Sequence, residues 1–427
     1  MIHAPTAVLL SSFLALPFVL GLRAADVPVR MVEVEGEGAK YWPRWRGPSG
    51  QGVVAGRSYV DRWSSSENLK WSVAVPGEGN SSPIVWGDRL FLTTAYDRGA
   101  RLTMLAFRRS DGQKLWETAL PVNARESVHA KNGHASATPV TDGERVYASF
   151  GGNGLAAFDL DGRLVWHRTF GPINNYHGAA GSPILYKDRI FLYQDHQPTS
   201  AQRGFVAAFD RKDGRTLWQS ERAETVGWGT PVVVRVDNHD ELIVSGQRRV
   251  AAYDPDSGRE LWTVRGNTFE VIPTPVVGHG FVFCSSGRAG PTFAIKPGGR
   301  GDVTQSHVVW STAKGSPFVP SGIVHGDLLY LVNDMQSILT VYEAASGAFV
   351  YQSRLGAATR EGFSASPVVV GDKLFFTNDE GETFVVQAGR QFKLLHTSSL
   401  GERTLASPAL VDGVWYWRTA SKLVAIG

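Results

Sequence analysis

Cysteine is nearly absent from this chain of 427 residues: Cys284, in "FVFCSSG", is the only one. A single cysteine cannot form an internal disulfide, and it cannot supply a Cys-x-x-Cys-His haem attachment site. Disulfide-rich secreted folds and c-type haem proteins are therefore excluded. We expect Cys284 to be a small buried residue within a strand.

A strong charge of either sign is also missing. Lys and Arg number 43 against 40 Asp and Glu, a net charge of +3. The basic residues occur at most in pairs such as Arg108-Arg109 and Arg248-Arg249. Because phosphate binding needs a concentrated basic face, we expect no nucleic-acid partner. The chain also lacks a Gly-x-Ser-x-Gly elbow, a Walker loop and a His-Glu-x-x-His signature, so hydrolase and NTPase functions have no support.

Long apolar runs are confined to one place, "AVLLSSFLALPFVLGL" at 7–22. This length is typical of the apolar part of a signal peptide and is short of the roughly 20 residues of a membrane span. We expect a signal peptide over 1–24 with cleavage after Ala24, and no transmembrane segment. Because no cysteine lies near that point, we expect no lipid anchor. These features predict an exported protein, periplasmic or secreted.

The sequence contains about eight copies of one repeated unit. A Ser/Thr-Pro pair, or Ser-Gly once, begins an apolar run, and a Gly-Asp or Asp-Gly turn leads to a second run, which is a hairpin signal. The units begin "SSPIVWGDRLFL", "ATPVTDGERVYA", "GSPILYKDRIFL", "GTPVVVRVDNHDELIV", "PTPVVGHGFVFC", "PSGIVHGDLLYL", "ASPVVVGDKLFF" and "ASPALVDGVWYW". Their starts lie 41 to 56 residues apart, and most contain two further apolar runs. Four strands in this period are typical of a propeller blade.

The repeat predicts an all-β fold over residues 63–427: an eight-bladed β-propeller of four-stranded antiparallel blades, nearly free of helix. The eighth unit ends at 421–427 after its third strand, and "NLKWSVAV" at 68–75 resembles the missing fourth. We expect this N-terminal strand to complete the last blade, which leaves no open edge. Seven blades is the alternative, if one irregular unit is not a full blade.

Residues 25–62 form an N-terminal leader that contains "YWPRWRGPSGQG". Its Trp42 and Trp45 alternate with Arg44 and Arg46, and such residues can stack cation on ring. We expect the leader to lie against the propeller, and a partner-binding role is the alternative.

A second recurring phrase, as in "AFDRKDGRTLW" at 208–218, joins the third and fourth runs of a unit. Its Asp, Ser and Gly residues suit a tight turn, and its Trp offers a flat surface for contact between neighbouring blades. We interpret the phrase as architectural. The expected docking residues are Trp71, Trp116, Trp166, Trp218, Trp262 and Trp310.

The phrase resembles the tryptophan-docking motif of PQQ-repeat propellers, which have the quinoprotein alcohol dehydrogenase-like fold. The segments "YWPRWRGPSGQG", "KNGHASATPVTDGERVY" and "KPGGRGDV" resemble a secreted planctomycete-type group of such proteins. A more distant resemblance is to the outer-membrane assembly lipoprotein, whose lipobox cysteine is missing here. The resemblance implies either a scaffold or an enzyme that uses pyrroloquinoline quinone (PQQ) with calcium. The quinone of such enzymes stacks on a ring formed by two adjacent cysteines, which this chain lacks.

Candidate site residues lie in two sets of loops that the propeller would bring to its central channel. Imidazole and carboxylate groups suit a metal or proton transfer, and cations suit an anionic ligand. The channel-face candidates are His129, Lys131, Asn132, His134, His177, Asp195, Trp228, Arg288, Asn333 and Asp334. Their spacing matches no defined metal motif, so we predict no metal site, and the catalytic residues of any enzyme are not assigned.

Two functions follow. The first is an exported, monomeric binding or scaffold module that takes a protein partner of the periplasm or cell envelope, or a small ligand at the channel face. The second is a PQQ-dependent or related quinoprotein-like oxidoreductase. A carbohydrate-active propeller is a weaker third, because the loops contain no convincing pair of carboxylates.

Overall fold

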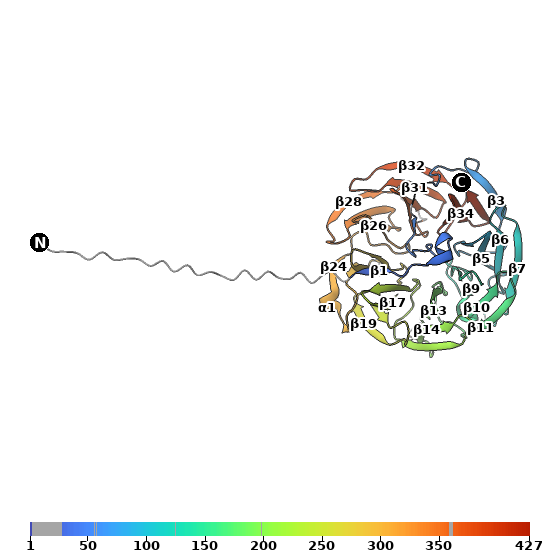
Figure 1. The fold of residues 1–427 in the computed structure, drawn as a ribbon, viewed down its shortest axis with the longest axis horizontal. Coiled ribbons are helices and arrows are strands. Elements are labelled where there is room, and N and C mark those ends of the chain that lie inside the picture. The colour runs from blue at the N-terminus through green and yellow to red at the C-terminus, as the bar shows by residue number, and fades with distance from the viewer. Residues whose placement is uncertain (2–27, 55, 57, 124, 198, 358–361) are drawn as a thin grey trace.

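The computed structural model describes Met1 and residues 28–427 except 55, 57, 124, 198 and 358–361. Over these residues, eight sheets surround a central axis (Figure 1). Each sheet contains four antiparallel strands, and two sheets carry short additional strands. The predicted eight-bladed propeller is confirmed, and the alternative of seven blades is excluded. The predicted signal peptide at 1–24 lies, beyond Met1, outside the described residues.

The blades follow one another around the ring in chain order. Blade one consists of β4 (Ile84–Trp86), β5 (Arg89–Tyr96), β6 (Arg101–Arg108) and β7 (Lys114–Leu120), and blade two of β8 (Val140–Thr141), β9 (Arg145–Ser149), β10 (Leu155–Asp159) and β11 (Leu164–Arg168). Blade three consists of β12 (Ile184–Tyr186), β13 (Arg189–Gln194), β14 (Gly204–Asp210) and β15 (Thr216–Arg222), and blade four of β16 (Val232–Val236), β17 (His239–Ser245), β18 (Arg249–Tyr253) and β19 (Glu260–Arg265). Blade five consists of β20 (Val276–Gly278), β21 (Phe281–Ser285), β22 (Thr292–Ile295) and β24 (Val308–Thr312), and blade six of β25 (Ile323–His325), β26 (Leu328–Asn333), β27 (Ile338–Glu343) and β28 (Phe349–Arg354). Blade seven consists of β29 (Val368–Val370), β30 (Lys373–Thr377), β31 (Glu382–Gln387) and β32 (Leu394–Ser399), and blade eight of β33 (Ala409–Val411), β34 (Val414–Arg418), β35 (Lys422–Ile426) and β3 (Leu69–Ala74).

Burial differs systematically between the strands of a blade. The middle strands β5 and β6 are buried along almost their whole length. The outer strands β3 and β24 instead alternate between half-buried and exposed residues. A middle strand is covered on both faces by the neighbouring blades, so its sequence is continuously apolar, whereas an outer strand also faces water. The hydrophobic core therefore lies between blades, in several clusters around the ring.

Strand β3 closes the ring, as predicted. It pairs antiparallel with β35, with Val73 opposite Leu423. The last blade is thus built from both ends of the propeller, which removes the open edge that a simple row of blades would leave. Helix is confined, in the described residues, to the short segments η1 (Gly36–Lys40), η2 (Gly151–Asn153) and α1 (Thr304–His307). None of these segments has the length and apolarity to cross a membrane.

The recurring phrase joins five of the blades to the blade that follows. The indole N–H of Trp218 in β15 donates to the carbonyl of Pro255, in the turn between β18 and β19 of the following blade, at 3.1 Å. Gly258 of that turn lies against the face of the same indole. The Gly and the Trp of the phrase therefore meet across blade boundaries. The same two contacts hold for Trp71 with Arg109 and Gly112, Trp116 with Leu160 and Gly162, Trp166 with Arg211 and Gly214, and Trp310 with Ala344 and Gly347.

Trp262 is arranged differently from the other five. Its indole N–H donates to Glu241 within its own blade, at 2.8 Å, and its side chain is fully buried. The short strand β23 (Gly301–Asp302) pairs with β19 beside it, with Gly301 opposite Trp262. This strand belongs to "KPGGRGDV", which replaces the usual turn of the next unit, so the carbonyl that receives the other indoles is not in place here.

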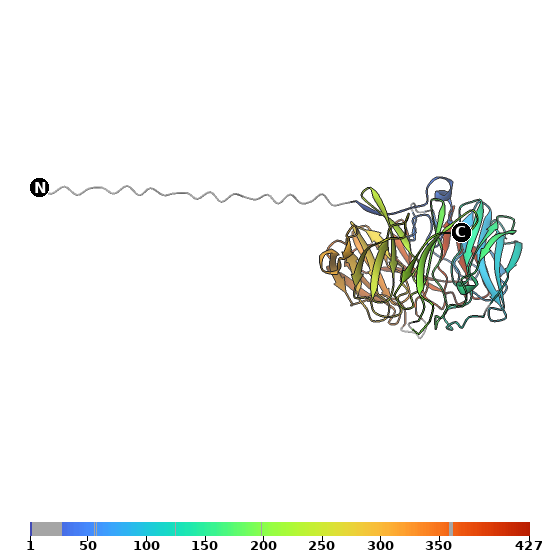
Figure 2. The same cartoon turned by 90° about the horizontal axis from the view of Figure 1, so that it is seen from below.

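The leader crosses one face of the propeller (Figure 2). It begins with β1 (Val29–Met31) beside β16, and it later forms β2 (Val53–Val54) beside β29. Between these strands it contacts further inner strands through a bridge between Trp42 and Val85 and a hydrogen bond from the Thr141 N–H to the Pro43 carbonyl. All these contacts are at the ends of the inner strands that face the first-to-second-strand turns. The leader thereby covers this end of the central channel.

Candidate functional site

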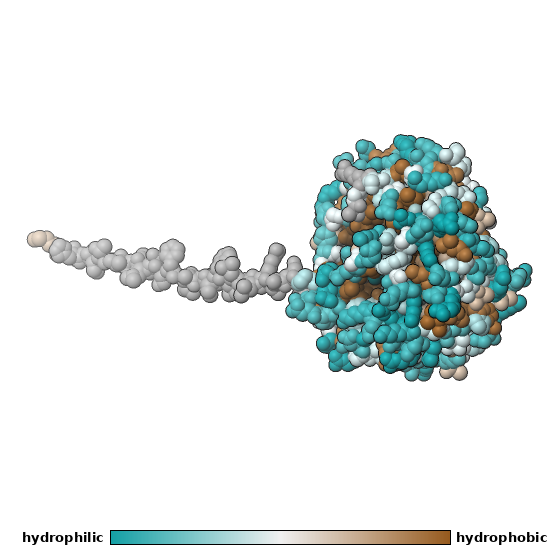
Figure 3. Space-filling model, turned by 45° about the vertical axis from the view of Figure 1, so that its right-hand side comes forward, coloured by the Kyte–Doolittle hydropathy of each residue, from teal (hydrophilic) through white to brown (hydrophobic). Residues whose placement is uncertain are grey.

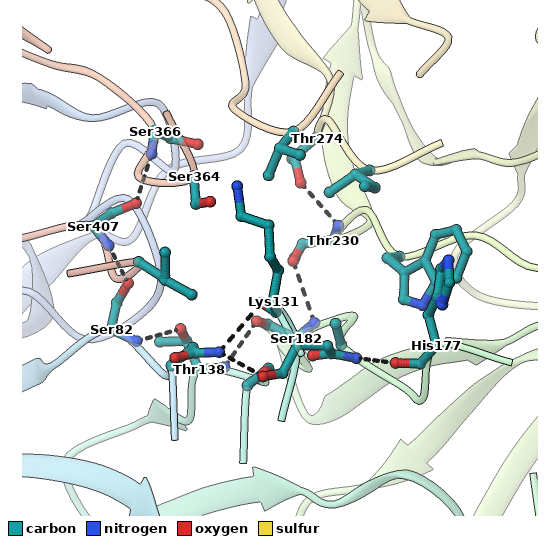
Figure 4. A pocket seen from close by; sticks show the side chains of 18 of the residues that line it. Ser82, Lys131, Thr138, His177, Ser182, Thr230, Thr274, Ser364, Ser366 and Ser407 are labelled. Carbon is teal, nitrogen blue, oxygen red and sulfur yellow. Dashed lines mark hydrogen bonds between the residues drawn. The ribbon is translucent and has the colours of Figure 1, made fainter. Parts of the chain in front are cut away.

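The central channel contains a pocket of about 250 Å³, lined by the loops that lead into the innermost strands (Figure 4). Trp45 of the leader belongs to its lining, so the leader forms part of the pocket wall. Charged and imidazole groups in the lining are His129, Lys131, His177, Glu270 and Arg288. Apolar groups are Trp45, Ala180, Trp228, Ile272, Phe318, Val319 and Leu405.

A closed circle of hydrogen bonds surrounds the pocket. It is formed by the Ser or Thr that begins each repeat: the backbone N–H of each donates to the side-chain hydroxyl of its counterpart in the next blade, at 2.8 to 3.2 Å. The Ser407 N–H donates to the Ser82 hydroxyl and completes the circle. We call this circle the hydroxyl ring; its members are Ser82, Thr138, Ser182, Thr230, Thr274, Ser321, Ser366 and Ser407. It fixes the loops at a common level, and all its members except Ser321 line the pocket.

Lys131 lies across the pocket. Figure 4 shows its side chain extended over the middle of the hydroxyl ring, toward Ser364. Its ammonium group contacts Asp379 of blade seven at 2.7 Å, and the Asp379 side chain is fully buried. The neighbouring Asn132 donates to the His177 carbonyl at 2.7 Å and connects the loops of blades two and three.

One wall of the pocket is an aromatic and imidazole cluster. The rings of His129 and His177 are 4.6 Å apart between centroids, and those of His177 and Trp228 are 5.6 Å apart. Tyr176 contacts both His177 and Trp228 edge to face. The indole N–H of Trp228 donates to the Gly178 carbonyl at 2.6 Å, which fixes its ring. Two of the predicted histidines and the predicted Trp228 are thus brought together.

The surroundings of the His129 imidazole favour its neutral form. Burial lowers its pKa, and the neighbouring His177 and Lys131 lower it further. Its Nδ1 accepts the backbone N–H of Lys131 at 3.1 Å, which leaves Nε2 as the protonated nitrogen and hence a hydrogen-bond donor.

Glu270 is the carboxylate of this wall. Its side chain lies 3.5 Å from His177 Nε2, accepts the Tyr176 hydroxyl at 3.3 Å and lies 3.2 Å from Arg288 Nε. Burial, and then the Glu270 charge, raise the pKa of Tyr176 to about 12. Arg288 also lies over the Phe318 ring, 5.1 Å from its centroid. Glu270 thus holds three side chains of the wall in place.

Four predicted site residues do not line the pocket. His134 lies with Nε2 2.9 Å from the Glu126 carbonyl, and Asn333 donates to the Ser316 carbonyl at 3.1 Å. Asp334 accepts the backbone N–H groups of Phe318 and Val319, at 2.9 and 3.2 Å, and so positions the loop that carries them.

Asp195 is the fourth. It pairs with Arg222 at 2.8 Å, and both side chains are fully buried. Burial raises the pKa of Asp195 to about 6, against the opposing charge of Arg222. Its place is in the interior between blades three and four, where Arg222 also donates to the Tyr253 hydroxyl of β18 at 3.0 Å.

Sequence reasoning missed Glu270, Trp45, Phe318 and the hydroxyl ring as parts of the pocket. Glu270 stands in "NTFEVIPTP", just before the Thr-Pro pair of its unit, and this position was the available signal. The hydroxyl ring was visible as eight equivalent Ser or Thr residues, because equivalent positions of a closed ring must face one another. No group of three or more His, Cys, Asp or Glu side chains that could hold a metal ion occurs among the described residues.

The comparisons with known proteins agree on the fold. The family profile PQQ_2, described as outer membrane protein assembly factor BamB, matches residues 36–201 and 202–426. Among solved structures, BamB from Moraxella catarrhalis is 12% identical with a TM-score of 0.58, over 83% of this chain and 95% of that one. A europium-containing methanol dehydrogenase is 11% identical with a TM-score of 0.65, over 92% and 98%. Quinohemoprotein alcohol dehydrogenase from Comamonas testosteroni is 12% identical with a TM-score of 0.63, over 91% and 80%. At these identities the likeness shows the fold alone. No curated protein matches the chain in sequence.

Proposed function

The chain belongs to the PQQ_2 family, described as outer membrane protein assembly factor BamB, and we propose that it is an exported propeller that binds a small molecule in its central channel. The observation that carries this proposal is the pocket in the central channel, to whose wall Trp45 of the leader contributes. Ligand pockets are typically concave, mostly apolar and equipped with a few fixed polar groups. The aromatic wall, the hydroxyl ring and the Glu270–Arg288 pair meet this description.

The surface gives less support to a scaffold that binds a protein partner. The side seen in Figure 3 mixes hydrophilic residues with apolar ones in separate groups. Five of the exposed large apolar side chains lie on the outer strands of five different blades: Leu115, Val165, Val309, Phe349 and Leu394. Protein interfaces usually present a contiguous apolar patch, whereas singly scattered residues are normal for a surface.

Filling the pocket should abolish ligand binding without unfolding the protein. Ala180 lines the pocket, and in Ala180→Phe the new ring would occupy the space of a ligand. We expect small aromatic probes of positive, neutral and negative charge, tested by saturation-transfer NMR, to include binders of the unmodified chain that Ala180→Phe no longer binds.

The matched control is Ala420→Phe, the same substitution at an exposed alanine between β34 and β35 that does not line the pocket. It should bind every probe as the unmodified chain does. Equal binding by the Ala180→Phe protein, or the absence of any binder in the panel, would argue against a ligand site in the channel.

The alternative is a quinoprotein-like oxidoreductase, which the likeness to the methanol dehydrogenase supports at the level of the fold. The described lining residues do not fit PQQ with calcium. Calcium takes six to eight oxygen ligands, usually with several carboxylates. Glu270 is the one carboxylate that lines the pocket, and it is already paired with Arg288. Cys284 is buried in β21 and is the only cysteine, so the cysteine platform that the resemblance implies cannot form.

We therefore expect calcium to leave any binding of PQQ unchanged. The measurement is a titration of the tryptophan fluorescence with PQQ at micromolar concentration, with calcium or with a chelator. Saturable quenching that requires calcium, followed by reduction of a dye when an alcohol is added, would establish the oxidoreductase instead.

A further inference from the structure

We infer that the ligand of the channel is an organic anion, an apolar ring or chain that carries a carboxylate or a similar oxyanion, and that Arg288 is its anchor. This inference rests on the proposed function, because it names the ligand class for the same pocket. Three features of the pocket carry it: an excess of hydrogen-bond donors, the way Arg288 is held, and the apolar surfaces beside it.

The donors come first from the hydroxyl ring. Each hydroxyl oxygen of the ring already accepts a backbone N–H. No acceptor for the hydroxyl protons occurs among the described residues, and seven of these groups line the pocket. His129 adds a further donor through Nε2, since its Nδ1 is already used as an acceptor. A ligand rich in acceptor oxygens would satisfy these groups, and a donor that a bound ligand buries without a partner is costly.

The position of Arg288 leaves the two terminal nitrogens of its guanidinium free. Nε lies 3.2 Å from Glu270, and the guanidinium rests over Phe318. Its two terminal nitrogens have no partner among the described residues, and the side chain is 48% exposed. A guanidinium binds a carboxylate or a phosphate through two parallel N–H groups. Because Glu270 and Phe318 already fix the side chain, little conformational entropy remains to be lost on binding.

The same pocket disfavours cations. Glu270, the one carboxylate in the described lining, faces Arg288, Tyr176 and His177, and its Oε2 accepts no hydrogen bond from the described residues. Lys131 extends a second cationic group across the pocket, where it pairs with Asp379. A cation would therefore have to compete with Arg288 for Glu270 and with Lys131 for Asp379. The apolar surfaces of Trp228 and Phe318 lie beside the donors and suit the carbon body of the ligand.

The test compares two probes of one shape, naphthalene-2-carboxylate and its neutral amide, by isothermal titration calorimetry. We expect the unmodified chain to bind the carboxylate about ten- to a hundredfold more tightly, as charged hydrogen bonds imply. Arg288→Gln should remove most of this preference and leave the affinity for the amide unchanged. Arg288→Lys, which keeps the charge without the fork, should fall between them.

The matched control is Arg265→Gln. Arg265 also pairs with a carboxylate, Asp302 at 3.0 Å, but it is exposed and does not line the pocket. It should bind both probes as the unmodified chain does, and thermal melts would show that each variant is folded. Equal affinity for the two probes, or an unchanged preference in Arg288→Gln, would overturn the ligand class while leaving a channel site that Ala180→Phe blocks. If neither probe binds, the ligand class fails; if the mixed-charge panel also yields no binder, the proposed function fails with it.

Discussion

Replacement of Asp195 by Ala should lower the free energy of unfolding by about 3–5 kcal/mol, because it leaves a buried cation without its partner. Asp195 and Arg222 are 2.8 Å apart, and the structure exposes neither side chain. Glu224 lies 3.6 Å from Arg222, but it is already paired with Arg249. The remaining guanidinium would therefore be poorly compensated in the interior between blades three and four. Urea denaturation followed by far-UV circular dichroism measures the loss.

Two further variants separate this explanation from a general sensitivity to losing an acidic residue. Asp302→Ala removes an exposed carboxylate that pairs with Arg265 and accepts two hydrogen bonds from Thr304, and it should cost about 1 kcal/mol. The double replacement Asp195→Leu with Arg222→Met should cost less than the sum of its two single changes, because it removes both buried charges together. If Asp195→Ala is instead as stable as Asp302→Ala but loses binding of the channel probes, Asp195 is a ligand residue, as the sequence suggested.

The architecture was predictable because sequence units with the same pattern of apolar and turn residues fold into the same structural unit. Eight similar hairpin units predict eight similar blades. A last unit that lacks its fourth strand predicts that another segment of the chain supplies this strand. The segment at 68–75 had the right pattern for that donor, and β3 does pair with β35. Trp262 shows the limit of this reasoning. Its own unit follows the pattern, but its contact depends on the next unit, in which "KPGGRGDV" replaces the turn.

The site was predictable only in part, because a polar loop residue can turn either toward the channel or into the body of the molecule. His129 and His177 turn toward the channel. His134, in the same loop as His129, instead contacts the Glu126 carbonyl. Asp195 comes directly after a strand, where a ligand residue is expected. Its side chain instead pairs in the interior with Arg222, which lies 27 residues later in the sequence. Partners of this kind depend on side-chain directions that the repeat pattern does not contain.

The glycine of the recurring phrase should be nearly irreplaceable. In Gly258→Ala we expect the free energy of unfolding to fall by about 2–5 kcal/mol. Gly258 has a φ of +73°, where an L-residue is strained by about 1–2 kcal/mol. A Cβ there would also lie 2.3 Å from Cε3 of Trp218, and such overpacking costs about 1–3 kcal/mol more. Urea denaturation of the two proteins measures the difference.

Gly280 separates the two contributions. It has a φ of +80° in the turn between β20 and β21, and a Cβ there would have no heavy atom within 4 Å. Gly280→Ala should therefore show the backbone strain alone, about 1–2 kcal/mol. In a protein that already carries Trp218→Ala, Gly258→Ala should lower the free energy of unfolding by only this strain, because the indole that the new Cβ would contact is absent. If that loss is the same with and without the indole, the turn backbone alone requires the glycine, and the contact between Gly and Trp of adjacent blades does not account for the phrase.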